Sequence, residues 1–452
     1  MKTGNIKSGL LVTVLCFIYF ISALSYAQTG MKAGAAKIDI TPAIEDLPSN
    51  FKSIRDNIYV RAIVIESKEK KAALVAADVA GFPDPIWEEI TKRVETEAGI
   101  PVPNVLLCAS HSHSVPFLAG DGMGRPATPA AKAYTKNVAE SIVKAIHQAI
   151  EKLQPARIGF GTGTSYMNVN RDVIDPETRL WTQGPNYQGP SDKTVAVVKI
   201  ENLKGEPFAV FYNFAVHANA LFMTGVLSSC IPGETSKNIE ETYGNKVIAL
   251  WSTGAAGDQN PMYHMPSISP AYSSRRNPGP LPQNMSVEPN RAVRQSKLVS
   301  SIGFFLGEEI VRVLQRTKRT YSDIDIGGYR TTVTCPGRKR TDQGGREGGK
   351  AAYEDGMPVN IRLGLLMVGD IAFTSVNGEA YNSIAQRLKK DSPYANTMFL
   401  SITNGRANSG YIPSDDAFGR STFQVLGSRL KPGCAEDAII NGILDMMDKD
   451  RK

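Results

Sequence analysis

Residues 106–114 read Leu-Leu-Cys-Ala-Ser-His-Ser-His-Ser, and the fold can be worked out from this stretch outward. Its apolar start follows Pro103-Asn104 and is typical of a buried strand. Because side chains i and i+2 of a strand point the same way, His111 and His113 should project together from its carboxyl end. In an open α/β sheet that end borders the ligand crevice.

Two histidines at such a place indicate metal binding or acid–base chemistry, since imidazole is the commonest metal ligand and titrates near neutral pH. The chain has only five histidines. A third, His217, closes another apolar run, residues 207–215, whereas His147 falls inside an amphipathic helix pattern and is interpreted as structural. For a bare His-x-His the alternative is two solvated histidines in a loop.

The start of the chain has the features of a secretory signal peptide over residues 1–27. Lys2 and Lys7 precede an apolar run at 9–24, and Ser25-Tyr26-Ala27 offers a cleavage site. A retained membrane anchor is the alternative, but the apolar run is near the short limit for spanning. We therefore expect residues 28–452 to form the mature protein, periplasmic or secreted, with no transmembrane segment.

Composition indicates an ordinary globular chain of 452 residues, with 42% hydrophobic and 21% charged residues. Removing residues 1–27 takes away two lysines and no acidic residue, which lowers the net charge from +7 to +5. This mild excess, without a nucleic-acid-binding module, gives no reason to expect a nucleic-acid partner. The densest basic patch, Arg338 to Arg340, lies in the Gly-rich run 337–350 and is predicted to be a solvated loop.

Alternating strand and helix patterns predict an α/β fold. No linker or repeat divides the chain, so we expect one large domain with central β-sheets flanked by helices. Residues 264–295 lack periodicity and should form a long surface excursion. The clearest expected elements are strands at 59–67, 71–78, 195–201, 207–215 and 246–252, and helices at 83–98, 129–153, 232–243 and 297–316.

Four cysteines remain in the mature chain: Cys108, Cys230, Cys335 and Cys434. Export would permit disulfides, and the sequence leaves all three full pairings open. Cys108 would lie on the strand face opposite His111, so we expect a buried thiol there.

Several scattered motifs together resemble the neutral/alkaline (non-lysosomal) ceramidases over nearly the whole mature sequence. No single motif is specific, but their number and order support the resemblance. The matching pieces are Lys37-Ile38-Asp39-Ile40-Thr41-Pro42, Asp78, Ser110-His111-Ser112-His113-Ser114, Asn168-Val169-Asn170-Arg171, Phe214-Ala215-Val216-His217, Gly257-Asp258, Gly378-Glu379 and Gly410-Tyr411-Ile412-Pro413.

The resemblance implies a Zn²⁺-dependent amidase. The site residues of the family then correspond to the residues at matching positions of this chain. His111, His217, Glu379 and Tyr411 would be the zinc ligands. In the same way, His113 would move a proton to the leaving group, Tyr411 and Arg171 would stabilise the oxyanion, and Asp258 and Asn260 would contact the substrate. Glu379 and Tyr411 enter only through the resemblance. Taken alone, a Glu after Gly indicates helix capping and a Tyr in a loop indicates packing.

The chain also departs from the family pattern. Ceramidases have a serine where this chain has Asn260, and an amide side chain is a poor nucleophile although it can donate a hydrogen bond. Val115 stands where the family prefers glycine. Longer members continue into a C-terminal β-sandwich, which we do not expect here. These differences bear on the identity of the substrate as ceramide more than on the zinc-dependent hydrolysis itself.

Three functions are compatible with the sequence. The first is an exported hydrolase that cleaves an N-acyl sphingoid or ceramide-like amide by zinc-activated water. The second is a zinc esterase or lactonase acting on a carbohydrate-derived substrate, and the third is a catalytically silent binding protein. A lipid substrate implies contact with a membrane surface and an apolar groove. Residues 116–118 and 221–223 could line such a groove or pack in the core.

Overall fold

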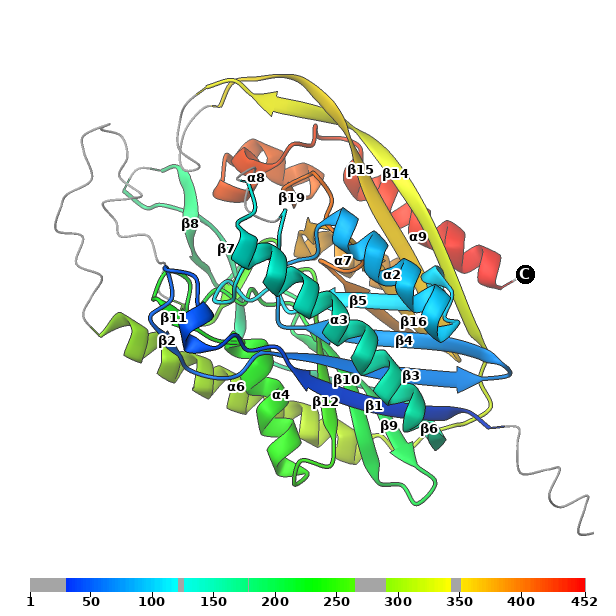
Figure 1. Ribbon diagram of the computed structural model, residues 1–452. Helices are drawn as coiled ribbons and strands as arrows, with labels where there is room; N and C mark the ends of the chain where they lie inside the picture. The colour runs from blue at the N-terminus through cyan, green and yellow to red at the C-terminus, as the bar shows by residue number, and fades with distance from the viewer. Residues whose placement is uncertain (1–29, 121–125, 178, 265–289, 343–350, 452) are drawn as a thin grey trace, which may run out of the picture.

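The computed structural model describes residues 30–120, 126–177, 179–264, 290–342 and 351–451. The predicted signal peptide and most of the predicted excursion at 264–295 lie outside these residues. A large eight-stranded sheet has the order β12-β10-β9-β6-β1-β3-β4-β5 (Figure 1). Its strands are β1 (Lys32–Asp39), β3 (Tyr59–Ser67), β4 (Lys70–Ala77), β5 (Val105–Ala109), β6 (Gln154–Thr164), β9 (Thr194–Asn202), β10 (Pro207–Phe214) and β12 (Ile248–Thr253).

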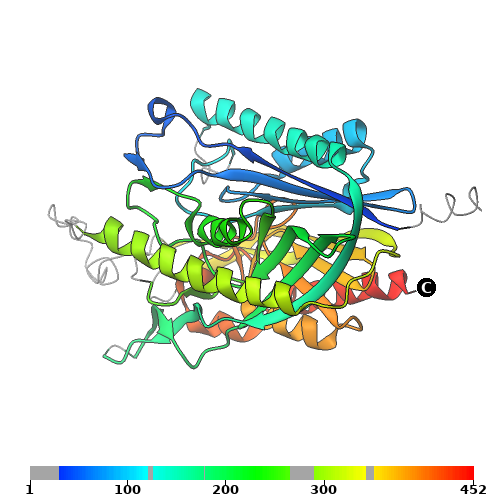
Figure 2. The same ribbon diagram turned by 90° about the horizontal axis from the view of Figure 1, so that it is seen from below.

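Four helices cover one face of this sheet, and Figure 2 shows α6 lying along it. They are α2 (Asp84–Ala98), α3 (Pro129–Glu151), α4 (Cys230–Thr242) and α6 (Arg291–Arg316). The sequence explains this arrangement, because successive strand residues are buried on opposite faces. In β3, for example, Val60, Ala62 and Val64 pack toward the helices, whereas Ile63 and Ile65 pack on the other side.

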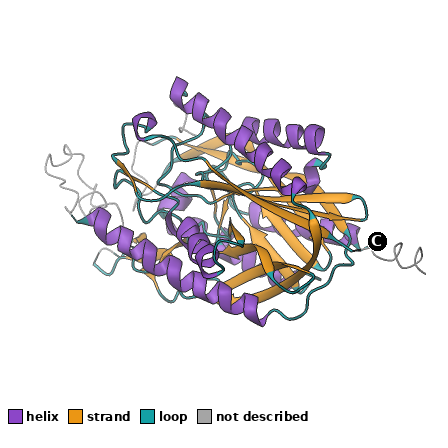
Figure 3. Ribbon diagram, turned by 60° about the horizontal axis from the view of Figure 1, so that its bottom comes forward, coloured by secondary structure: helices purple, strands orange, loops and turns teal. Residues whose placement is uncertain are grey.

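The other face of the large sheet packs against a four-stranded sheet of order β14-β15-β16-β18. Phe211 of β10 meets Phe373 of β16 at this interface, with ring centroids 5.5 Å apart. Strands therefore form the middle of the molecule and helices its outer layers (Figure 3). The elements are β14 (Ile326–Arg340), β15 (Tyr353–Val368), β16 (Ile371–Val376) and β18 (Asn396–Leu400), covered by α7 (Asn382–Asp391) and α9 (Ala435–Asp450).

Short elements gather near the carboxyl ends of β5, β10 and β12. They include a three-stranded sheet of order β13-β7-β8 and two parallel two-stranded pairs. These elements are β2 (Ser53–Ile54), β7 (Asn168–Ile174), β8 (Trp181–Asn186), β11 (Val226–Leu227), β13 (Gln259–Pro261), β17 (Glu379–Ala380), β19 (Tyr411–Ile412), α8 (Phe423–Gly427) and the 3-10 turns η2 (Ile44–Asp46) and η4 (Asp415–Arg420). A further 3-10 turn, η3 (Val102–Asn104), lies at the amino end of β5.

The α/β prediction is confirmed, as are the strand pairs at 59–78 and 194–214 and the four expected helices. Two predictions of local structure are wrong in this part of the fold. Residues 291–295, expected within the surface excursion, begin α6. Arg338 to Arg340 are not in a solvated loop but form the end of β14, which arches over the molecule with β15 (Figure 1). Arg338 packs over the Tyr353 and Phe418 rings, Lys339 pairs with Glu354 and Arg340 with Asp342. Two of the three basic side chains are therefore paired with carboxylates, and the third packs on aromatic rings. Among the described helices, none combines the length and apolar character needed to cross a membrane.

A disulfide joins Cys335 of β14 to Cys434, the residue before α9, while Cys108 and Cys230 are buried free thiols. Burial raises the pKa of Cys108 to about 12 and that of Cys230 to about 11. Both thiols are therefore unreactive at neutral pH, as expected from the sequence for Cys108.

We expect Cys434→Ala to lower the free energy of unfolding by about 2–5 kcal/mol, because the bond closes a loop with a sequence separation of 99 residues. Urea denaturation followed by circular dichroism measures the change. Dithiothreitol should produce the same loss in the wild-type protein and none in the variant. An unchanged midpoint in the variant would contradict a stabilising role.

Candidate active site

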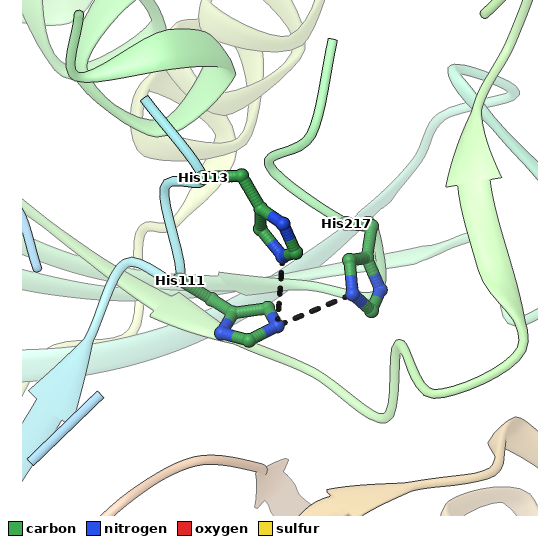
Figure 4. Close-up of side chains that lie close together, drawn as sticks. All are labelled: His111, His113 and His217. Atoms are coloured by element: carbon green, nitrogen blue, oxygen red, sulfur yellow. Dashed lines mark hydrogen bonds between the residues drawn. The ribbon is translucent and has the colours of Figure 1, made fainter. Parts of the chain in front are cut away.

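The candidate site lies where four separate parts of the chain meet near the carboxyl ends of strands. His111 and His113 follow β5, His217 follows β10, and Glu379 and Tyr411 lie opposite each other on β17 and β19. Figure 4 shows the three imidazole rings pointing toward one another from their two loops. The sequence therefore located the correct strand ends.

The local geometry of His111 differs from the prediction. Strand β5 ends at Ala109, and His111 has φ +58°, the left-handed region, so the alternation of a strand does not place the two histidines. Hydrogen bonds hold the turn instead. The His111 N–H donates to Val79 O over 3.0 Å, and the His113 N–H donates to Ala218 O over 3.0 Å. The second bond links the His-x-His loop directly to the loop that carries His217.

The three Nε2 atoms converge. His111 Nε2 lies 3.2 Å from His217 Nε2 and 3.3 Å from His113 Nε2. The opposite ring nitrogens are already used, since Nδ1 of His111 is 2.7 Å from Ala80 O and Nδ1 of His217 is 2.8 Å from Ala256 O. A neutral imidazole whose Nδ1–H donates to a carbonyl has a lone pair on Nε2. Two lone pairs then face each other, an arrangement that a cation would stabilise.

The carboxylate of Glu379 completes this group. Its Oε2 lies 3.4 Å from Nε2 of both His111 and His217, and it is a buried oxygen with no hydrogen-bond partner. Burial raises the pKa of Glu379, but the neighbouring His111 and His217 hold it well below the usual value. The carboxylate is therefore ionised at neutral pH, and one of its oxygens is available to a ligand.

These donors fit a divalent metal ion. Burial and, secondarily, Arg171 lower the pKa of His217 to about 4, and burial together with His111 lowers that of His113 well below its usual value. Both rings are thus neutral at pH 7, the form that binds metal. Two imidazoles with one carboxylate are a known catalytic zinc set. One ring nitrogen from each of His111, His113 and His217 lies within 4.8 Å of the other two. By geometry, His113 is therefore a further candidate metal ligand.

Arg171 and Tyr411 lie next to these groups. Arg171 is 2% exposed, and its guanidinium donates twice to Gly257 O, over 3.2 and 2.5 Å. Its Cζ lies 5.3 Å from the centroid of the Tyr411 ring, which in turn lies 6.4 Å from the His217 ring. Burial lowers the pKa of Arg171, but Tyr411 and Glu379 raise it above the usual value, so the guanidinium keeps its charge.

Asn260 is in direct contact with Arg171. Its Oδ1 accepts hydrogen bonds from Arg171 Nη1 over 3.3 Å and from Asn219 Nδ2 over 3.1 Å. The residue that the resemblance aligns with the ceramidase serine therefore contacts Arg171 and Asn219, although it lacks a nucleophilic atom.

Asp258 is placed differently from Asn260. Its carboxylate is buried, and its two oxygens accept from Asn170 Nδ2 and from the backbone N–H of Asn382, the first residue of α7, each over 2.8 Å. These contacts favour a positioning role over direct substrate contact. A side chain on Gly257 would come within 2.6 Å of Glu379 O, which explains the glycine before Asp258.

The apolar residues at 116–118 and 221–223 were expected either to line a groove or to pack in the core, and both kinds occur. Leu118 and Leu221 are 2% and 1% exposed and pack in the core. By contrast, Phe117 and Met223 are 48% and 69% exposed, and Phe222 contacts the His113 ring edge-on with centroids 5.5 Å apart. Of these side chains, Phe222 contacts the site directly, and two exposed ones lie near it in the sequence.

Sequence reasoning missed two polar residues at this site. Asn219 follows His217 by two residues, and His264 follows β13. Asn219 contacts Asn260, while burial, followed by the positive charges of Arg291 and Arg171, lowers the pKa of His264. Their only sequence signal is closeness along the chain to His217 and Asn260.

Comparisons with known proteins agree with this geometry. The profile of the family described as neutral/alkaline non-lysosomal ceramidase, N-terminal, matches residues 35–266. Neutral ceramidases A and B of Dictyostelium discoideum are 27% and 26% identical over 202 and 224 residues. These alignments cover 42% and 45% of this chain but only 28% and 31% of the relatives, so the chain matches about a third of their length.

Solved structures show the same fold. A ceramidase complexed with C2 superposes with a TM-score of 0.71 and 14% identity, over 94% of this chain and 76% of the other. The neutral ceramidase from Pseudomonas aeruginosa gives a TM-score of 0.68 and 15% identity, over 94% and 75%. Because the family profile covers just over half of the 452 residues, the chain belongs to the neutral/alkaline non-lysosomal ceramidase family.

Proposed function

We propose that this protein is an exported zinc-dependent hydrolase that cleaves the amide bond of an N-acyl sphingoid, ceramide-like substrate. The observation that carries the proposal is the convergence of His111 Nε2, His217 Nε2 and the unpaired Glu379 Oε2 within 3.2–3.4 Å of one another. Family membership and the ceramidase fold support an amide as the bond that is cleaved.

His111, His217 and Glu379 would hold the metal, with Tyr411 as the fourth ligand implied by the family. When bound, zinc polarises a carbonyl and lowers the pKa of water from about 15.7 to about 7. The residues around it orient the ligands: the carbonyls of Ala80 and Ala256 fix the two imidazole rings through Nδ1. Such contacts to the second ring nitrogen tune metal affinity.

Arg171 and Tyr411 are placed to stabilise negative charge on the substrate oxygen. The Arg171 charge is buried, where electrostatic stabilisation is larger than in water. His113 has its Nε2 beside His111 and a neutral ring at pH 7, so it can take a proton and deliver it to the leaving amine. An acyl-serine route has no nucleophile at position 260, where the amide of Asn260 holds Arg171 instead.

Several features support export and a lipid substrate. Disulfides persist in oxidising compartments, so the Cys335–Cys434 bond agrees with the predicted signal peptide of residues 1–27. Phe117 and Met223, which are exposed and close in sequence to His113 and His217, are suited to an apolar chain or to contact with a membrane surface.

Incubating the purified protein with N-octanoyl-sphinganine, matched esters and lactones, with and without a zinc chelator, tests the proposal. We expect release of the fatty acid from the amide, loss of activity with chelator, and recovery with added Zn²⁺. Faster turnover of the ester or lactone would favour the esterase reading instead. Bound zinc without turnover of any acyl compound would indicate a binding protein.

A further inference from the structure

Unsatisfied polar atoms occur in the metal group and in residues that closely follow His217 and Asn260 in the chain. Among the described residues, buried side-chain atoms without a hydrogen-bond partner include Glu379 Oε2, Asn219 Oδ1 and His264 Nδ1. A buried polar atom left unpaired costs about 1–3 kcal/mol, and folded proteins keep few of them. The metal accounts for Glu379 but not for the other two.

The orientation of the two asparagine amides is fixed by their neighbours. Asn260 Oδ1 accepts from both Arg171 Nη1 and Asn219 Nδ2. If either amide were reversed, donor would face donor or acceptor would face acceptor, so the assignment follows from the network. Asn219 Oδ1 is then an acceptor without a donor, and Asn260 Nδ2 is a donor that makes no hydrogen bond within the described residues.

His264 follows Asn260 by four residues, and its Nδ1 is a buried atom without a hydrogen-bond partner. A backbone hydrogen bond of 3.1 Å from His264 N–H to Pro261 O turns the chain back after β13, the strand that carries Asn260. Burial, followed by the charges of Arg291 and Arg171, lowers the pKa of His264 to about 3. The imidazole is thus neutral at physiological pH and offers one donor and one acceptor.

We propose that Asn219, Asn260 and His264 form a hydroxyl-binding wall that recognises the amine portion of the substrate next to the scissile amide. This inference rests on the proposed function. A hydroxyl both donates and accepts, and so it can satisfy the Asn219 acceptor and the Asn260 or His264 donor. A purely apolar amine would leave all three groups unpaired, and a carboxylate would be repelled by the Asn219 oxygen.

The hydroxyl could belong to a sphingoid base or to an amino sugar, since both place hydroxyls beside an acylated nitrogen. Three neutral, non-hydrolysable sulfonamides separate these sources: N-octylsulfonyl-sphinganine, N-octylsulfonyl-octadecylamine, which lacks hydroxyls, and N-octylsulfonyl-glucosamine. Equilibrium binding of each in detergent micelles gives a Kd that does not depend on turnover.

We expect the wild-type protein to bind the hydroxylated lipid at least roughly tenfold more tightly than the deoxy compound, as one or two lost buried hydrogen bonds imply. His264→Ala and Asn219→Ala should each bring that ratio close to one while zinc content stays unchanged. His147→Ala, which removes a half-exposed histidine on α3, should keep the wild-type ratio.

Equal affinity of the wild-type protein for all three compounds would overturn the proposal, as would a preference that survives both substitutions. Preference for the glucosamine compound would support the wall and identify a sugar as its ligand. If N-octanoyl-sphinganine is not hydrolysed, the amidase proposal fails, but the ratio of Kd values still tests the wall.

Discussion

Glu379→Gln should lower zinc affinity by more than about 100-fold, because loss of even an outer contact to a metal ligand costs roughly 10–100-fold. Amide hydrolysis should fall at least as far. The substitution keeps the shape of the side chain but removes the negative charge that faces His111 Nε2 and His217 Nε2, each 3.4 Å away. Zinc content of the purified variant, measured by atomic emission, reports the first effect directly.

Glu240→Gln is the matched control for this substitution. Glu240 is another buried carboxylate, and it is paired with Lys37 over 2.5 Å and with Arg61 over 2.9 Å, outside the metal group. The Glu240→Gln variant should lose stability but keep its zinc. His113→Ala should also keep zinc if that residue moves protons, whereas loss of zinc from it would place His113 among the ligands. Full zinc in Glu379→Gln would refute our ligand assignment.

Arg171→Met should lower kcat by about 10²–10³-fold, the usual effect of removing a donor that stabilises an oxyanion. Methionine keeps an unbranched stem but is shorter than arginine, and it lacks the charge beside Tyr411 and the donors to Gly257 O and Asn260 Oδ1. We expect zinc content to remain near the wild-type value, because no proposed ligand atom is removed. Stopped-time assays across substrate concentration separate kcat from KM.

Arg171→Lys distinguishes charge from geometry at this position. Lysine keeps the positive charge but cannot form the planar fork that reaches Gly257 and Asn260 together. A partial recovery of kcat would show that the charge acts on the substrate. If the Arg171→Met variant had the wild-type kcat, the role of Arg171 would be limited to holding the paired strands β7 and β13 in place.

Local patterns predicted much of the fold. The β3–β4 and β9–β10 pairs follow from alternation and polar turns, and α2 and α3 from four-residue spacing. Strand β14 escaped detection because its sequence, IGGYRTTVTCPGRKR, combines glycines and basic residues that are typical of loops. It is a strand because β15 pairs with it over most of its length, which is a long-range property.

The site could be predicted only in part for the same reason. His111, His113 and His217 each follow an apolar run, and that signal is local. Glu379 and Tyr411 meet through the short parallel pair of β17 and β19, whose partners are distant in sequence, so only the family resemblance found them. No pattern distinguished Asn219 or His264, because their role depends on which atoms remain unpaired after folding.

The positive φ of His111 restricts how this position can be redesigned. Asn and Asp tolerate the left-handed region, whereas β-branched side chains do not. Substituting Asp or Asn would thus alter the ligand field without straining the main chain, which opens a route to oxygen-preferring ions such as Mn²⁺. A saturation library here should yield folded proteins from only a narrow set of amino acids, whatever their metal.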